Sequence, residues 1–154
     1  MKFAISTAFL SFAGLVSSAN IAARQFCAEA VRFGVLSVSS PTGASSFNAG
    51  DDIAIKVDLN CAVNHFNIVP RFLDYAINVP ASVNNGHEPD IVLARRTLPA
   101  GALSDSFTTK IPHGFFFAGA AYQVIFTNTY PINGTDGSEV LIQEGMLQPI
   151  TINT

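Results

Sequence analysis

The sequence predicts an all-β protein, an immunoglobulin-like or fibronectin III-like β-sandwich of about seven strands. Three observations support this fold class. Turn-forming residues recur about every eight to twelve positions, β-branched and aromatic residues fill the segments between them, and no long segment keeps a helical period. Such short segments bury their apolar faces only by stacking two sheets, so we expect a single sandwich.

Seven segments fit this pattern. The clearest is 52–59, in which Ile53, Ile55 and Val57 alternate with small or polar residues and therefore share one face. The last segment contains Gly145 and Pro149, so we expect a bulge or a change of sheet there. The expected strands are residues 32–38, 52–59, 72–79, 91–97, 103–111, 121–128 and 139–152.

Tyr122 stands near the start of the sixth expected strand, shortly after Gly119. This pattern resembles a tyrosine corner, in which the hydroxyl bonds to the backbone of the connection between the fifth and sixth strands. An ordinary core tyrosine is the alternative.

Residues 1–19 predict a cleavable signal peptide. Lys2 precedes the uncharged apolar run 3–16, and small residues lead to a cleavage site after Ala19, with Ala23 as the second choice. A membrane anchor or buried helix is the alternative, but the run is short for a bilayer. We therefore expect residues 24–154 to form one secreted, extracellular domain, with no membrane association in its mature form.

Cys27 and Cys61 are the only cysteines, and an exported chain passes through an oxidising compartment. A structural disulfide is therefore expected. Closing a loop of about 35 residues would stabilise the fold by roughly 3.8 kcal/mol in the chain-entropy model. A reactive or metal-binding thiol is the alternative, but neither cysteine has a CxxC spacing or a neighbouring base.

Charge is sparse, at 12% of residues against a usual share of about 25%. Loss of Lys2 with the signal peptide leaves seven basic residues against 11 acidic ones, a net charge of −4. Nucleic acids and anionic membranes need a basic face, so neither is an expected partner.

Two stretches around the first connection carry a family resemblance. Residues 38–43 read Val-Ser-Ser-Pro-Thr-Gly, and residues 47–55 read Phe-Asn-Ala-Gly-Asp-Asp-Ile-Ala-Ile. This pattern resembles the opening of the Ig-like module of the fungal Kre9/Knh1 cell-wall synthesis proteins. The resemblance implies a secreted fungal β-sandwich associated with the cell wall, and it implies no catalytic residues.

The residue types that carry catalysis are scattered. His65, His87 and His113 fall in three different connections, so at most a His87/His113 pair could share one end of the sandwich. The carboxylate pairs Asp51/Asp52 and Glu88/Asp90 occupy turn sequences. The chain has none of the nucleophile, phosphate-loop or zinc signatures. We therefore expect a non-catalytic protein without a cofactor, and a hydrolase or metal enzyme is the less favoured alternative.

Loop residues give the best binding hints. His65 and Phe66 would lie at the same end as Tyr130, where an exposed aromatic would suggest contact with a cell-wall polysaccharide or an extracellular protein. For Phe66 itself, the favoured interpretation is that it caps the core. At least one of the three phenylalanines at 115–117 should face outward unless it is covered, and burial under the connection between the first two strands is the favoured interpretation.

The loop 133–139 is rich in oxygen ligands. Asp136 and Glu139 could contribute to a calcium site, but a hairpin turn is the favoured interpretation. Asn133-Gly134-Thr135 is the single N-glycosylation sequon of the chain, and it lies at the predicted loop tip.

Overall fold

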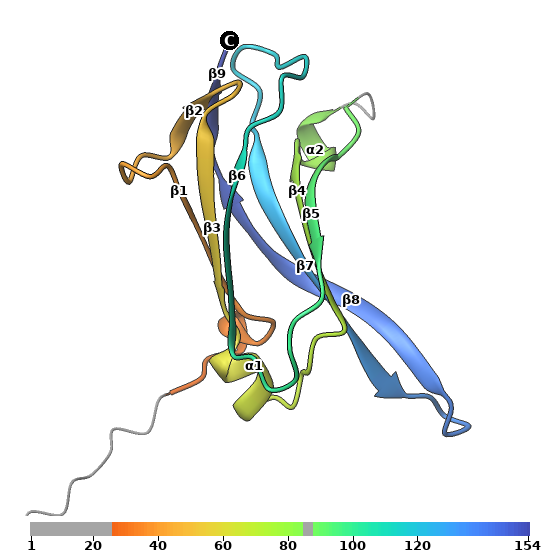
Figure 1. The fold of residues 1–154 in the computed structure, drawn as a ribbon. Helices are drawn as coiled ribbons and strands as arrows, with labels where there is room; N and C mark the ends of the chain where they lie inside the picture. Colours follow the sequence, from red (N-terminus) through yellow and green to blue (C-terminus); the bar gives the residue numbers. More distant parts are fainter. Residues whose placement is uncertain (1–25, 85–87) are drawn as a thin grey trace, which may run out of the picture.

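The computed structural model describes residues 26–84 and 88–154, and it is built mainly from β-strands (Figure 1). The predicted signal peptide therefore lies outside the described residues. No helix in the described part is long and apolar enough to cross a membrane. In chain order the elements are η1 (Glu29–Val31), β1 (Val35–Ser39), β2 (Ser46–Asn48), β3 (Asp52–Asp58), α1 (Asn60–Asn64), β4 (Phe72–Asn78), α2 (Ala81–Asn84), β5 (Ile91–Arg96), β6 (Ser104–Lys110), β7 (Gln123–Asn133), β8 (Glu139–Pro149) and β9 (Thr151–Asn153).

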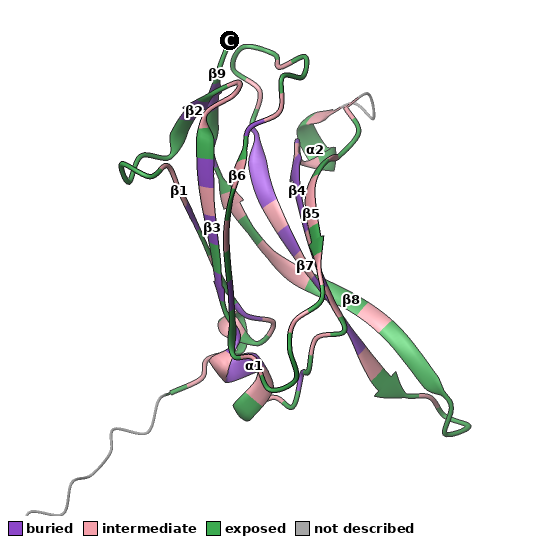
Figure 2. Cartoon of the chain, in the orientation of Figure 1, coloured by how far each residue is buried: buried purple, intermediate pink, exposed green. Residues whose placement is uncertain are grey.

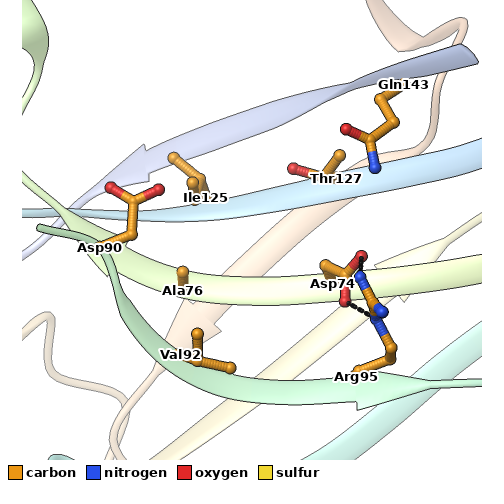
Figure 3. A pocket seen from close by; sticks show the side chains of 8 residues that line it. All are labelled: Asp74, Ala76, Asp90, Val92, Arg95, Ile125, Thr127 and Gln143. Carbon is orange, nitrogen blue, oxygen red and sulfur yellow. Dashed lines mark hydrogen bonds and ion pairs between the residues drawn. The ribbon is translucent and has the colours of Figure 1, made fainter.

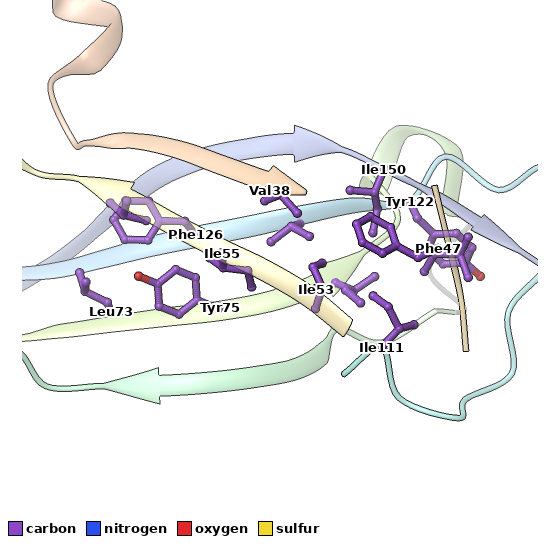
Figure 4. Packing of buried hydrophobic residues seen from close by; sticks show 14 of the residues in the cluster. Val38, Phe47, Ile53, Ile55, Leu73, Tyr75, Ile111, Tyr122, Phe126 and Ile150 are labelled. Atoms are coloured by element: carbon purple, nitrogen blue, oxygen red, sulfur yellow. The ribbon is translucent and has the colours of Figure 1, made fainter. Parts of the chain in front are cut away.

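Two antiparallel sheets form the sandwich. One has the strand order β1-β3-β6, and the other has the order β5-β4-β7-β8. Their inner faces enclose one apolar core, in which Tyr75, Phe47 and Phe126 are the largest of the fully buried side chains (Figure 4). The predicted all-β sandwich is confirmed. The fourth main strand, β5, pairs with β4, whereas in a constant-type immunoglobulin domain it would join the opposite sheet.

Strand β3 shows how the sequence produces the core. Ile53, Ile55 and Val57 are at most 1% exposed, while Asp52, Lys56 and Asp58 face solvent. The predicted alternation is therefore confirmed. One face of β3, the middle strand of its sheet, packs into the core.

The last expected strand changes sheet at Ile150. β8 ends at Pro149, and β9 then pairs in parallel with the short strand β2, which the sequence pattern did not predict. The expected break at Gly145 is absent, because β8 pairs with β7 in unbroken register through this residue. A Cβ built on Gly145 would overlap the carbonyl oxygen of Phe126, so the close approach of the two strands requires glycine here.

The Cys27–Cys61 disulfide is confirmed. Cys27 precedes β1 and Cys61 lies on α1, directly after β3. Because β1 and β3 are antiparallel neighbours, the two cysteines reach the same end of the sandwich, with their Cα atoms 5.5 Å apart.

A partly buried ionic group joins the two sheets at another edge. The Arg96 Nε donates to the Asp105 carboxylate at 2.6 Å, and the Tyr75 hydroxyl donates to the same oxygen at 3.0 Å. The Asp105 side chain is 3% exposed, and burial raises the pKa of Tyr75. These hydrogen bonds link β5 and β4 to β6, so the three side chains stabilise the packing of the two sheets.

Candidate functional site

The connection between β6 and β7 presents two phenylalanine rings to solvent. Phe116 packs edge-on against Tyr122, with ring centroids 5.4 Å apart, and contacts the core. Its neighbours Phe115 and Phe117 are 97% and 59% exposed. The expectation that this segment is buried under the connection between the first two strands is therefore wrong for these two rings. With the middle ring anchored against Tyr122 and the core, its two neighbours point to solvent.

Tyr122 fixes the conformation of this connection. The backbone N–H of Phe117 donates to the Tyr122 hydroxyl at 2.9 Å. The tyrosine corner is thereby confirmed, and Tyr122 is more than an ordinary core residue. Burial, assisted by the nearby Glu88 carboxylate, raises the pKa of Tyr122.

A hollow of about 430 Å³ opens beside Phe117, between the connection and α2. Asn84 of α2 fixes the backbone on the opposite side of the hollow. Its Nδ2 donates to the backbone carbonyls of Val79 and Glu88, and its Oδ1 accepts from the Glu88 N–H. We call Phe115, Phe117 and this hollow the aromatic end. The hollow is lined by Val79, Val83, Asn84, Glu88, Phe117, Gly119, Ala120 and Ala121.

The outer face of the four-stranded sheet forms a second depression, which we call the trough (Figure 3). Its volume is about 460 Å³. Arg95 donates from Nε and Nη2 to the Asp74 carboxylate at 2.6 and 3.0 Å, and this pairing raises the pKa of Arg95. The lining residues are Asp74, Ala76, Asp90, Val92, Arg95, Ile125, Thr127 and Gln143.

An apolar row crosses the trough. It runs across β5, β4, β7 and β8 through the direct cross-strand partners Val92, Ala76, Ile125 and Leu147, so it spans all four strands. The two end residues, Val92 and Leu147, are 74% and 55% exposed. A solvated sheet face is normally polar, and a continuous apolar row on it therefore marks a possible contact surface.

Of the residues that the sequence grouped as ligand contacts, Phe66 packs against the core and Tyr130 is buried in it. His65 and Phe66 follow α1, where the Phe66 ring is half-buried against the core and has the Arg32 guanidinium 5.5 Å from its centroid. Phe66 thus caps the core, which is the interpretation that the sequence favoured. Tyr130 lies within β7, is 8% exposed and packs near Phe33. It is a core residue and not a loop residue, because β7 continues to Asn133.

The loop 133–139 forms the favoured hairpin turn. The Asp136 carboxylate accepts hydrogen bonds from the N–H and hydroxyl of Ser138 at 2.9 and 2.7 Å, and these bonds lower the pKa of Asp136. Glu139 pairs with Arg71 through two bonds of 2.6 and 2.8 Å. Both acidic side chains of the loop therefore have structural partners.

Among the residues that the structure describes, the histidines and paired carboxylates are not assembled into a metal or catalytic centre. His113 is exposed near Gly50, and His65 lies at the other end of the sandwich, while His87 is outside the described residues. Asp51 accepts from the turn residue Asn48, and Asp52 pairs with Lys110. Within ranges 26–84 and 88–154, no three His, Cys, Asp or Glu side chains are placed to hold a metal ion.

Sequence reasoning missed both surfaces described above. The trough depends on strand order and register, which place Val92 and Leu147 in one row. The run of three phenylalanines was visible, but its orientation depends on which ring contacts Tyr122.

Comparisons with known proteins give little further information. No family model and no curated protein matches the chain. Among solved structures, it is similar to a superoxide reductase (neelaredoxin) from Ignicoccus hospitalis, with a TM-score of 0.43 and 11% identity over 77% of this chain and 80% of that chain. A variant of that reductase has a TM-score of 0.37 and 10% identity over the same shares. Likeness at this level supports no inference about activity.

Proposed function

We propose that the mature chain is a secreted, non-catalytic module that binds a cell-wall or other extracellular polysaccharide through its aromatic end. The signal-like sequence 1–19 supports export, and the Cys27–Cys61 bond is compatible with it. The resemblance to the Kre9/Knh1 module supports a wall location.

The observation that carries the proposal is the exposure of Phe115 and Phe117 on one connection, where Phe117 also lines a hollow together with Glu88. An aromatic face stacks well on the C–H face of a sugar ring, and a few polar groups then select among hydroxyls. Glu88, whose carboxylate also interacts with the Tyr122 hydroxyl, is the charged residue that lines the hollow. The tyrosine corner holds the ring-bearing connection in place before binding, which lowers the entropic cost of association.

Sedimentation with insoluble polysaccharides tests this function. The full chain, secreted and purified, is mixed with chitin or β-glucan, and the bound fraction is compared with that of the Phe115→Ser/Phe117→Ser double variant. We expect wild type to sediment with at least one polymer and the double variant to lose about tenfold in affinity, the effect of roughly 1.4 kcal/mol.

Phe26→Ser is the matched control, because Phe26 is 88% exposed at the opposite end of the sandwich. If this control loses as much affinity as the double variant, binding is non-specific. If wild type binds neither polymer, a polysaccharide role at the aromatic end is contradicted.

A second candidate function is binding to an extracellular protein, and the trough favours it. Its row of aliphatic side chains beside the Asp74–Arg95 pair has the mixture of apolar core and polar rim typical of protein interfaces. Cross-linking of the chain to proteins of the medium or of a host surface should then be lost in Val92→Lys and unchanged in Phe117→Ser. Capture that is insensitive to Val92→Lys would contradict this use of the trough.

A further inference from the structure

The hairpin formed by β7 and β8 projects beyond the sandwich and carries the sequon at its tip (Figures 1 and 2). β4 accompanies β7 only as far as the pair of Phe72 with Thr129, so the last four residues of β7 have β8 as their single paired neighbour among the described strands. This arm exposes apolar side chains, including Leu141 at 45%.

Asn133 is sterically available at the end of this arm. It is the last residue of β7, opposite Glu139, and both it and Thr135 are exposed. Within the described part of the chain, neither side chain is engaged in a hydrogen bond. The turn is closed instead by backbone bonds from the Gly134 N–H to Ser138 and from the Gly137 N–H to Gly134, and by the Asp136 carboxylate.

The register places Asn133 on the same face as Leu141. Strand residues alternate between faces, so Asn133 shares a face with Pro131, and Leu141 is the direct partner of Pro131. Asn133 and Leu141 are thus diagonal neighbours, a relationship that sets such residues roughly 7–8 Å apart. Val140 points to the opposite face with its partner Ile132.

From this placement we propose that Asn133 carries an N-linked oligosaccharide whose first sugar covers Leu141. This inference rests on the proposed export, because the modification occurs in the secretory pathway. The modified site lies far from the aromatic end. The first sugar of the oligosaccharide would cover the apolar face of the arm around Leu141.

The modification is a group transfer from a lipid-linked oligosaccharide diphosphate. A bond forms between Asn133 Nδ2 and the anomeric carbon of the first N-acetylglucosamine, and the bond from that carbon to the diphosphate breaks. The lipid diphosphate leaves, and Nδ2 gives one proton to a base of the transferase. No oxidation or reduction occurs.

Intact mass of the full chain secreted from a eukaryotic host tests occupancy. Digestion with a peptide N-glycosidase should remove the mass of one oligosaccharide from wild type and from Thr135→Ser, and none from Asn133→Gln or Thr135→Ala. A chain retained unmodified inside the cell overturns both this proposal and the proposed export. A secreted chain of unmodified mass overturns the glycan alone.

A thermal-melting cycle tests the contact with Leu141. Asn133→Gln should lower the Tm by roughly 2–4 °C in the wild-type background, and by less than half as much in the Leu141→Ser background. Val140→Ser is the matched control on the other face, and it should leave the effect of Asn133→Gln unchanged. Equal effects in the Leu141→Ser and Val140→Ser backgrounds contradict the contact.

Discussion

The side-chain amide of Gln148 forms two hydrogen bonds with the backbone of Val38. Its Oε1 accepts from the Val38 N–H at 2.9 Å, and its Nε2 donates to the Val38 carbonyl at 3.0 Å. Gln148 is on β8 and Val38 is on β1, so one side chain takes the place of a neighbouring strand and joins the two sheets at this edge. The Arg96–Asp105 pair bridges β5 and β6.

Gln148→Ala should therefore lower the free energy of unfolding by about 2 kcal/mol, because Val38 is 4% exposed and loses partners for both backbone groups. Urea denaturation measures the change. Gln143→Ala is the control on the same strand, since Gln143 makes one side-chain bond to Thr129, and it should cost about 0.5 kcal/mol or less. Equal losses would show that the bridge contributes nothing beyond an ordinary surface contact.

Tyr122→Phe removes only the hydroxyl that accepts from Phe117. We expect a loss of about 1–2 kcal/mol in unfolding free energy, since the Phe117 N–H is left without its partner. Hydrogen exchange should also show faster exchange at Phe117 than in wild type. If the exchange rate there is unchanged, the tyrosine corner does not hold the connection.

Gly145→Ala should destabilise the sandwich by at least about 2 kcal/mol, because the added methyl group overlaps the main chain of β7 and forces the strands apart. Thermal melting measures the loss. Gly114→Ala is the matched control, since a Cβ there has only ordinary contacts of 3.8 Å or more. It should change stability by no more than about 0.5 kcal/mol. A neutral Gly145→Ala would contradict the close approach of β7 and β8.

Stability should fall at alkaline pH because of Tyr75. Burial raises its pKa in the folded state, so above the ordinary tyrosine value of about 10 the unfolded chain loses a proton that the folded chain keeps. The stabilisation is complete below that pH and is lost as the pH rises above it. Urea midpoints at pH 8, 10 and 11 should decline more steeply for wild type than for Tyr75→Phe. Parallel declines would contradict a protonated Tyr75 in the fold.

The strands and the disulfide were predictable because local pattern determines them. β3 alternates through its whole length, and Cys27 and Cys61 flank two neighbouring strands. The strand β2 was not predictable, because three residues are too few to show a period and their partner β9 is about 105 positions away in the sequence.

The end of β7 was missed for a different reason. Proline lacks the N–H that a central strand needs, so Pro131 argues against a strand. Beyond Thr129, however, β7 has only β8 beside it among the described strands, and it continues to Asn133. Proline is tolerated at such an edge. This extension removed Tyr130 from the predicted contact loop and placed it in the core.

The position of the chain end has a practical consequence for immobilising this protein. Thr154 lies at the same end of the sandwich as the connection that bears Phe115 and Phe117, while Cys27 is fastened at the opposite end (Figure 1). An affinity handle fused after Thr154 would crowd those rings against a resin or sensor chip. A handle placed ahead of Cys27 would instead leave them facing the bulk liquid, so the choice of tag decides whether a binding assay can succeed.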